Sequence, residues 1–188
     1  MYVFDWLIAA CWAVFIIVWA YSAVGAKRNK SVGAYARGFI FRVLALIIVI
    51  VVLHFFVPLD TLRSISTTDT LWRGVVGVAL CAIGIAFAVW ARVYLGRNWG
   101  MPMSVKESPE LVVTGPYAYV RHPIYTGVIL GMLGSALVAG WIWLIVALVA
   151  AAYFIWSATH EEKQMEQTFP DAYPAYKKRT KMLIPFVL

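Results

Sequence analysis

Two short polar clusters stand out in a chain that is otherwise mostly apolar. The first, Arg121-His122-Pro123, comes directly before a long uncharged run, and the second, Glu161-Glu162, comes directly after it. A guanidinium, an imidazole and two carboxylates can bind a polar ligand, and the imidazole or a carboxylate can take a proton from a nucleophile. Ionisable groups that meet at the edge of a membrane are a reasonable hypothesis for a site.

Both clusters also have a structural interpretation. Thr159-x-x-Glu162 matches a helix capping box, and acidic residues favour the first turn of a helix. His122 precedes a proline, a position typical of a turn, where its role could be structural. The other two histidines are expected to be a packed residue in an apolar helix, for His54, and an interfacial residue, for His160. Spacing alone therefore leaves the two interpretations open.

The rest of the sequence holds no common catalytic signature. The glycine-rich nucleotide-binding motifs, the serine-hydrolase motif and the zinc-protease motif do not occur. Cys11 and Cys81 lie within apolar runs and are expected to be buried free thiols, and no metal site is predicted. The net charge of +7 could indicate nucleic-acid binding, but no nucleic-acid-binding motif accompanies it.

The composition indicates a membrane protein. Hydrophobic residues make up 63% of the 188 residues, whereas soluble domains are about half apolar. The predicted fold is one all-α integral membrane domain over 1–188, with five transmembrane helices and a cytoplasmic amphipathic C-terminal helix. Its expected parts are three spans within 1–95 (about 3–26, 39–59 and 71–95), a polar loop at 96–123, a helical hairpin at 124–159 that breaks at Ala139-Gly140, and a tail at 160–188.

The distribution of Lys and Arg predicts the orientation of the chain. Basic residues gather after the first span, in the region 92–121 and in the tail, whereas the loop at 61–70 holds only Arg63. Because cytoplasmic loops of membrane proteins are enriched in Lys and Arg, the N-terminus is expected outside and the C-terminus in the cytoplasm. The polar loop and the tail would then share the cytoplasmic face.

About the C-terminal half of the chain carries several short motifs in a fixed order. The motifs are Leu111-Val112, Gly115-Pro116-Tyr117, Arg121-His122-Pro123-x-Tyr125, Glu161-Glu162 and Phe169-Pro170-Asp171-Ala172-Tyr173, with Asn98-Trp99 upstream. In these motifs the chain resembles the isoprenylcysteine carboxyl methyltransferase family, whose members are integral membrane enzymes that use S-adenosylmethionine. The order of the motifs is specific, whereas the first two expected helices are generic.

The resemblance implies an S-adenosylmethionine site on the cytoplasmic side, with Arg121 as the catalytic residue. The methyl group would pass to a lipid-like or prenylated acceptor that enters from the bilayer, for example to a carboxylate that becomes a methyl ester. No catalytic triad is needed, because the cofactor carries the reactive methyl group. The implied cofactor-binding residues are Pro109, Glu110, Leu111, Val112, Tyr117, His122, Pro123, Ile124, Tyr125, Glu161 and Glu162.

The chain departs from the family pattern at two positions. Pro109 stands where the family often has a histidine, which would alter one cofactor contact. Ser157 stands four residues before Glu161, where the isoprenylcysteine enzymes carry an arginine for the substrate carboxylate. A buried carboxylate favours a bidentate arginine, and Arg121 and Arg92 are the alternative cations.

Three other functions compete with this interpretation. Phospholipid N-methylation uses the same small helix-bundle plan and the same cofactor. An NADPH-dependent sterol-type membrane reductase also carries an Arg-His motif before a membrane hairpin, although such enzymes are usually longer. A membrane scaffold without enzymatic activity would leave the ionisable groups Arg121, His122 and Glu161 unexplained.

The predicted orientation can be tested with single cysteines placed at Ser31 and Thr67. Position 31 is expected to be labelled only from the cytoplasmic side and position 67 only from the outside, because of the segregation of basic residues. Labelling of position 31 from the outside would show that the orientation is reversed.

The serine at position 157 predicts that prenylcysteine is a poor methyl acceptor. Loss of a charge-assisted contact to a desolvated carboxylate costs about 1.5–3 kcal/mol, which is roughly a 10- to 150-fold lower rate if the contact forms in the transition state. Methyl transfer to a farnesylated cysteine analogue should therefore be slow in the natural protein and faster in Ser157→Arg. Efficient turnover by the natural protein, without a gain from the arginine, would exclude position 157 as the determinant.

Overall fold

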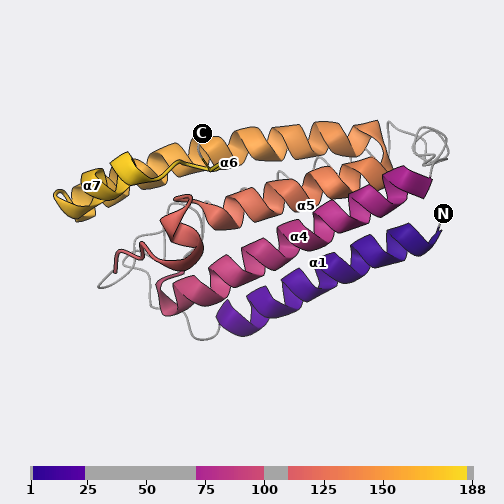
Figure 1. The fold of residues 1–188 in the computed structure, drawn as a ribbon, viewed down its shortest axis with the longest axis horizontal. Coiled ribbons are helices and arrows are strands. Elements are labelled where there is room, and N and C mark those ends of the chain that lie inside the picture. The colour runs from indigo at the N-terminus through magenta and orange to yellow at the C-terminus, as the bar shows by residue number, and fades with distance from the viewer. Residues whose placement is uncertain (1, 24–70, 100–109, 186–188) are drawn as a thin grey trace, which may run out of the picture.

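The computed structural model describes residues 2–23, 71–99 and 110–185. In this part of the chain four long helices lie side by side in chain order (Figure 1). They are α1 (Tyr2–Ala23), α4 (Leu71–Leu95), α5 (Pro123–Ala139) and α6 (Trp141–Thr168). The short helices are η1 (Gly96–Asn98), η2 (Gly115–Ala118) and α7 (Ala172–Arg179). The described residues form no strand, so the predicted all-α class is confirmed.

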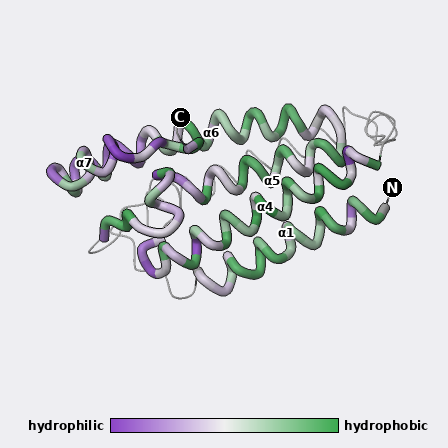
Figure 2. Tube along the Cα trace, in the orientation of Figure 1, coloured by the Kyte–Doolittle hydropathy of each residue, from purple (hydrophilic) through white to green (hydrophobic). Residues whose placement is uncertain are grey.

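Three of these helices, α1, α4 and α6, are long and apolar enough to cross a membrane, and α5 is a shorter apolar helix. Hydrophobic residues follow the middle of all four helices, and hydrophilic residues gather at the end of the bundle that holds α7 (Figure 2). The predicted span at 39–59, the loop at 61–70, His54 and Pro109 lie outside the described residues.

The contacts between helices fix their relative directions. Phe4 of α1 meets Gly74, and Arg92 of α4 donates to the carbonyl of Ser22, so α1 and α4 run the same way. Helix α5 runs back along α4, and α6 returns beside α5 (Figure 1). The C-terminal ends of α1, α4 and α6 therefore lie at the same end of the bundle as the start of α5. The two polar clusters Arg121-His122 and Glu161-Glu162 also lie at that end.

A glycine seam brings the backbones of α4 and α5 into contact. A Cβ atom on Gly84 would lie 2.5 Å from the nitrogen of Gly131 and 2.6 Å from the carbonyl oxygen of Gly127. A Cβ atom on Gly77 would lie 2.7 Å from the carbonyl oxygen of Gly134. Small residues permit such close helix approach in membranes, where van der Waals packing stabilises helix pairs. The glycines of α4 and α5 therefore pack against each other.

The hairpin between α5 and α6 turns at Gly140, where the apolar run was expected to break. Gly140 has a φ of 105°, in the region that favours glycine. The predicted boundary after Thr159 is wrong, because α6 continues to Thr168 without interruption. Thr159 donates its hydroxyl to the carbonyl of Trp156 in the preceding turn, so the proposed capping box does not begin a new helix.

Helix α1 is held against the others by few polar contacts. The indole of Trp12 donates to the hydroxyl of Ser135 on α5 at 3.0 Å. Most of the other side chains of α1 are exposed apolar groups, which suits a lipid-facing helix. Cys81 is buried, Cys11 is half-buried, and both are free thiols as expected.

The glycine seam predicts that Gly84→Ala destabilises the protein much more than Gly131→Ala. The new methyl group at 84 meets the backbone of α5 at 2.5 Å, whereas at 131 it meets the end of the Ile85 side chain at 3.2 Å, which can move. Overpacking of this kind costs about 1–3 kcal/mol. Thermal unfolding in detergent should show a clearly lower midpoint for Gly84→Ala, and equal midpoints for the two variants would contradict the seam.

Candidate functional site

The polar end of the bundle is closed by the C-terminal tail, which lies against the segment before α5. The backbone nitrogen of Arg121 donates to the carbonyl of Lys181 at 2.8 Å, and that of His122 donates to the carbonyl of Met182 at 3.0 Å. One turn later the hydroxyl of Thr126 donates to the carbonyl of Leu183 at 2.7 Å. The tail is therefore paired with the chain where α5 begins, as in a short parallel ladder.

A buried ion pair joins α6 to this junction. The Nε of Arg121 donates to Oε1 of Glu162 at 2.6 Å, and the two side chains are 7% and 4% exposed. The same guanidinium donates through Nη1 to the backbone carbonyls of Thr180 and Lys177. Because all these partners belong to α6 or the tail, Arg121 connects three segments that are distant in the sequence.

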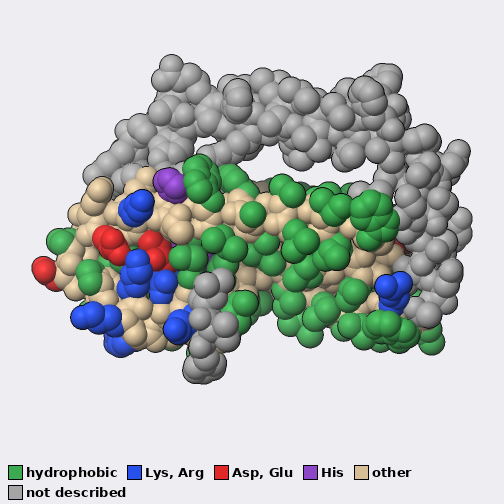
Figure 3. Space-filling model, turned by 90° about the horizontal axis from the view of Figure 1, so that it is seen from above, with side chains coloured by type: hydrophobic (Ala, Val, Ile, Leu, Met, Phe, Trp, Pro, Cys, Tyr) green, Lys and Arg blue, Asp and Glu red, His purple; other side chains and the backbone are tan. Residues whose placement is uncertain are grey.

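Lys177 of α7 completes the charge network around Glu162. Its Nζ lies 2.9 Å from Oε2 of Glu162 and 2.9 Å from Oε1 of Glu166. Hydrogen bonds to these two carboxylates raise the pKa of Lys177 above its ordinary value. Charged side chains gather at this end of the molecule, and apolar side chains cover most of the visible surface of the described bundle (Figure 3).

The second carboxylate, Glu161, has different neighbours. Its Oε1 accepts a hydrogen bond from the hydroxyl of Tyr125 at 2.5 Å and another from the hydroxyl of Ser157 at 3.1 Å. The ring of His122 lies between the two glutamates, with Nδ1 3.6 Å from Oε2 of Glu161 and Nε2 3.5 Å from Oε1 of Glu162. The structure thus brings the two polar clusters of the sequence into contact.

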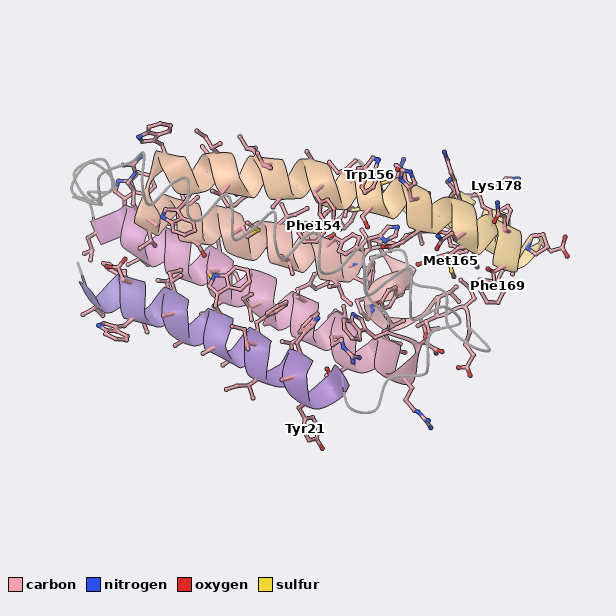
Figure 4. All side chains as sticks on the ribbon, turned by 180° about the vertical axis from the view of Figure 1, so that it is seen from behind. Tyr21, Phe154, Trp156, Met165, Phe169 and Lys178 are labelled. Atoms are coloured by element: carbon pink, nitrogen blue, oxygen red, sulfur yellow. The ribbon has the colours of Figure 1, made fainter. Side chains whose placement is uncertain are left out.

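The ring of Tyr125 is part of an aromatic stack between α5 and α6. It is parallel to the ring of His122, with centroids 5.4 Å apart, and it stacks on Phe154 with centroids 4.7 Å apart. Phe154 lies on the side of α6 that faces α5 (Figure 4). The stack fixes the plane of the imidazole and places its edge toward the carboxylates.

Tyr117 connects the loop before α5 to α4 and to α7. Its hydroxyl donates to the carbonyl of Ala91 in α4 at 3.4 Å, and its own carbonyl accepts from the hydroxyl of Tyr176 at 2.6 Å. Burial raises the pKa of Tyr117 and raises that of Tyr176 to about 12. Both hydroxyls therefore stay protonated at neutral pH and can act as donors.

A second polar group lies where α4 ends. The buried Arg92 donates to the carbonyls of Ser22 and Gly96 at 2.6 and 2.8 Å, and its guanidinium lies 4.5 Å from the ring centroid of Trp99. A cation is favourable at the C-terminal end of α1, where the carbonyls lack helical partners. Asn98 donates to Glu110 at 3.1 Å, which ties η1 to the start of the loop.

The predicted site residues are therefore not all equivalent. Arg121, His122, Tyr125, Glu161 and Glu162 form one connected cluster. Tyr117 and Pro123 are buried beside it, and Ile124 is half-buried at the start of α5. Glu110 instead accepts a hydrogen bond from Asn98, and Leu111 and Val112 follow it as half-buried residues.

Three contributions were missed from the sequence: Lys177, Thr180 and Tyr176 all reach the site from the tail. No local signal marked these positions, since their partners are distant in the sequence. Ser157 was noted only as a departure. Its spacing of four residues from Glu161, one helical turn, could have indicated the contact.

The site has unused hydrogen-bonding capacity that fits a polar cofactor with an ammonium group, hydroxyls and ring nitrogens. Within the described part of the chain, Nε2 of His122 and Oδ1 of Asn98 are buried without a hydrogen-bond partner. Buried polar atoms of this kind usually bind a ligand or water. The carboxylates of Glu161 and Glu110 are natural partners for an ammonium group or sugar hydroxyls.

The chain is similar to several known proteins, methyltransferases among them. A model of the phospholipid methyltransferase family matches residues 72–172. The chain is 31% identical over 123 residues to the nickel-cobalt-cadmium resistance protein NccN of Alcaligenes xylosoxydans xylosoxydans, covering 64% of this chain and 55% of that protein. It is 33% identical over 101 residues to the protein-S-isoprenylcysteine O-methyltransferase of Schizosaccharomyces pombe, covering 52% and 43%. Each alignment spans about half the length of the relative.

A solved structure of the eukaryotic intramembrane Ras methyltransferase ICMT shares the fold. The TM-score is 0.57 at 23% sequence identity, and the match covers 85% of this chain and 55% of that one. The resemblance to isoprenylcysteine carboxyl methyltransferases is thereby confirmed. The family model covers just over half of the chain and includes both polar clusters, and so the chain belongs to the phospholipid methyltransferase family.

Proposed function

We propose that the protein is an integral membrane methyltransferase that moves the methyl group of S-adenosylmethionine to a lipid-like or prenylated acceptor. The observation that carries this proposal is the contact between the two clusters within the region that matches the family model. His122 lies 3.6 Å from Glu161, although the two residues are separated by the whole helical hairpin. The connected group of an imidazole, two carboxylates and a tyrosine hydroxyl suits a small polar cofactor.

The proposed cofactor site lies between the junction before α5 and the last turns of α6. Glu161 would accept hydrogen bonds from the cofactor. Nε2 of His122, which makes no hydrogen bond and lies 3.5 Å from Oε1 of Glu162, would bind one of the cofactor's polar atoms. We assign Arg121 a positioning role here, because its guanidinium is held by Glu162 and by tail carbonyls. The remaining members of the proposed site are Pro109, Glu110, Leu111, Val112, Tyr117, Pro123, Ile124, Tyr125 and Glu162.

When bound, the cofactor supplies an activated methyl group, and the protein must align the acceptor with it and exclude water. Correct alignment alone can lower the activation free energy by about 7–11 kcal/mol at the high end. Arg121 and Thr126 donate to carbonyls of the C-terminal tail, and these contacts hold the tail over the junction before α5. The tail would thereby keep water out of the site. No nucleophilic side chain is required.

The surrounding membrane arrangement follows from the proposed topology. A five-span chain with its N-terminus outside would place the site on the cytoplasmic face, where the cofactor is dissolved. The shared direction of α1 and α4 supports this topology, because it requires an odd number of crossings between the start of α1 and the end of α4. The acceptor would approach from the bilayer, between helices whose outer faces are apolar.

Phospholipid N-methylation is the second candidate, and the description of the matching family favours it. The named relative from Schizosaccharomyces pombe instead methylates a prenylated cysteine. Both candidates use the same cofactor site and differ only in the acceptor.

Calorimetry with S-adenosylhomocysteine tests the cofactor site. The natural protein should bind this product and should not bind NADPH, whereas a sterol-type reductase would show the opposite preference. His122→Ala and Glu161→Ala should each weaken binding roughly 10- to 150-fold, the value of one charge-assisted hydrogen bond of about 1.5–3 kcal/mol.

Tyr119→Phe is the matched control for these variants. Tyr119 is 60% exposed and lies close to the site in sequence, so its replacement should leave the affinity unchanged. If His122→Ala and Glu161→Ala both bind S-adenosylhomocysteine as tightly as this control while remaining folded, the proposed site is wrong.

A further inference from the structure

The end of the bundle opposite the proposed cofactor site carries an arginine in a mostly apolar surface. This end holds the starts of α1 and α4 and the turn between α5 and α6 (Figure 1). Among the described residues at this end, Asp5 and Arg73 carry a charge. Arg73 is exposed in the first turn of α4, and its guanidinium lies 6.0 Å from the ring centroid of Trp72. Within the part of the chain that the structure describes, it forms no ion pair, so its charge is available to a ligand.

Arg73 lines a groove of about 350 Å³ that α4, α5 and α6 form together. The other lining residues are Leu133, Ala136, Leu137, Gly140, Trp141 and Leu144. Ala136 and Gly140 leave space between the larger side chains, because one ends at Cβ and the other has no side chain. The volume lies within the range of ligand sites in proteins, about 300–1,000 Å³. The groove is thus apolar apart from one cation, and none of its lining residues is acidic.

Tryptophans place this groove at the level of lipid headgroups. The rings of Trp72, Trp141 and Trp143 are exposed at this end of the bundle. Tryptophan is enriched where a membrane protein crosses from hydrocarbon to headgroups, because its ring is apolar and its N–H needs a polar partner. Arg73 is expected at the same level, since a guanidinium is costly in hydrocarbon. A ligand that reaches both the groove and the guanidinium is therefore a molecule of the membrane.

We propose that this groove binds one anionic phospholipid, with the phosphate on Arg73 and the start of an acyl chain against the apolar lining. A guanidinium presents paired N–H donors in a plane, which matches the geometry of a phosphate. Basic pockets between transmembrane helices bind anionic headgroups in this way. A zwitterionic lipid brings an ammonium group as well, for which the lining residues offer no carboxylate. Charge complementarity therefore favours a lipid whose headgroup has a net negative charge.

A lipid in this groove would join α4 to α6, which both pack on α5. It would contact α4 through Arg73 and α6 through Trp141 and Leu144. Because these residues come together only in the folded bundle, the lipid binds the folded state and not the unfolded chain, and so it stabilises the bundle. The groove lies at the other end of the bundle from Arg121 and Glu162, so this site goes beyond the proposed methyl transfer and does not depend on it.

Native mass spectrometry of the delipidated protein in detergent tests the headgroup preference. Binding of the first lipid molecule is compared for phosphatidylglycerol and phosphatidylcholine with the same acyl chains. The natural protein should bind phosphatidylglycerol roughly 10- to 100-fold more tightly, the effect of one charge-assisted contact. Arg73→Gln should lose this preference, and Arg73→Lys should keep part of it, because an ammonium group retains the charge without the paired donors. Equal affinity of the natural protein for the two lipids would overturn the proposal.

Arg179→Gln is the matched control, because Arg179 is an exposed cation at the opposite end of the bundle. Both variants remove one positive charge from the protein. An equal loss of preference in Arg73→Gln and Arg179→Gln would show that net charge and not the groove selects the lipid, which would overturn the proposal. Glycerol phosphate should bind much more weakly than phosphatidylglycerol, because it leaves the apolar lining uncovered. Binding of glycerol phosphate as tight as that of the lipid would assign the site to free phosphate instead.

A variant that fills the groove tests the location of the lipid. Leu144→Trp adds an indole among the lining residues, whereas Leu148→Trp adds the same side chain one turn later, at an exposed position of α6 that does not line the groove. Saturating phosphatidylglycerol should raise the thermal unfolding midpoint of the natural protein and of Leu148→Trp, each measured against its own lipid-free midpoint, and should raise that of Leu144→Trp much less. Equal stabilisation of the two tryptophan variants by the lipid would place the lipid elsewhere and overturn the proposal.

Discussion

The buried ion pair between Arg121 and Glu162 is the interaction on which the site depends. Both side chains are almost fully buried, and desolvation of two charges is offset only when every donor and acceptor finds a partner. Here the offset comes from Lys177 on the second oxygen of Glu162 and from tail carbonyls, including that of Thr180, on the guanidinium. Removal of one partner from such a pair costs about 3–5 kcal/mol. The tail is thus held in place because its carbonyls accept hydrogen bonds from the buried guanidinium of Arg121. His122, which follows Arg121 in the chain, is thereby held beside Glu161.

The membrane part of the molecule gives this pair a fixed frame. Close backbone packing at Gly84 and Gly127 sets the position of α5 on α4, and therefore the position at which Pro123 begins α5. Tyr117 then ties the loop to α4 through the carbonyl of Ala91. Because α5 is short and α6 long, the last turns of α6 extend beyond the start of α5 and carry Glu161 and Glu162 to the loop. Helix length, more than loop conformation, brings the carboxylates to the imidazole.

Much of this arrangement could be predicted from the sequence. Apolar length predicted the helices at 71–95 and around the hairpin, and the glycine at 140 predicted the turn, because both signals are local. The uninterrupted course of α6 through Thr159 could not be predicted, since capping residues and continuous helix share the same local pattern. The contacts of Lys177 with Glu162 and of Thr180 with Arg121 could not be predicted either. They depend on how the tail folds back onto the bundle and not on neighbours in the chain. The proposed chemistry of the site comes from the resemblance to a family, because charge spacing alone left it open.

The proposed cofactor site is one surface made by the junction before α5, the end of α6 and the tail. Hydrogen–deuterium exchange of the protein in nanodiscs, with and without S-adenosylhomocysteine, tests most directly whether these segments form one cofactor site. Binding of one cofactor at this surface predicts slower exchange in two segments at once, the amides of 121–126 and the amides of 180–183. The first segment includes the amides of Arg121 and His122, which donate to tail carbonyls. Unchanged exchange in both segments at saturating S-adenosylhomocysteine, or protection confined to α1, would contradict it.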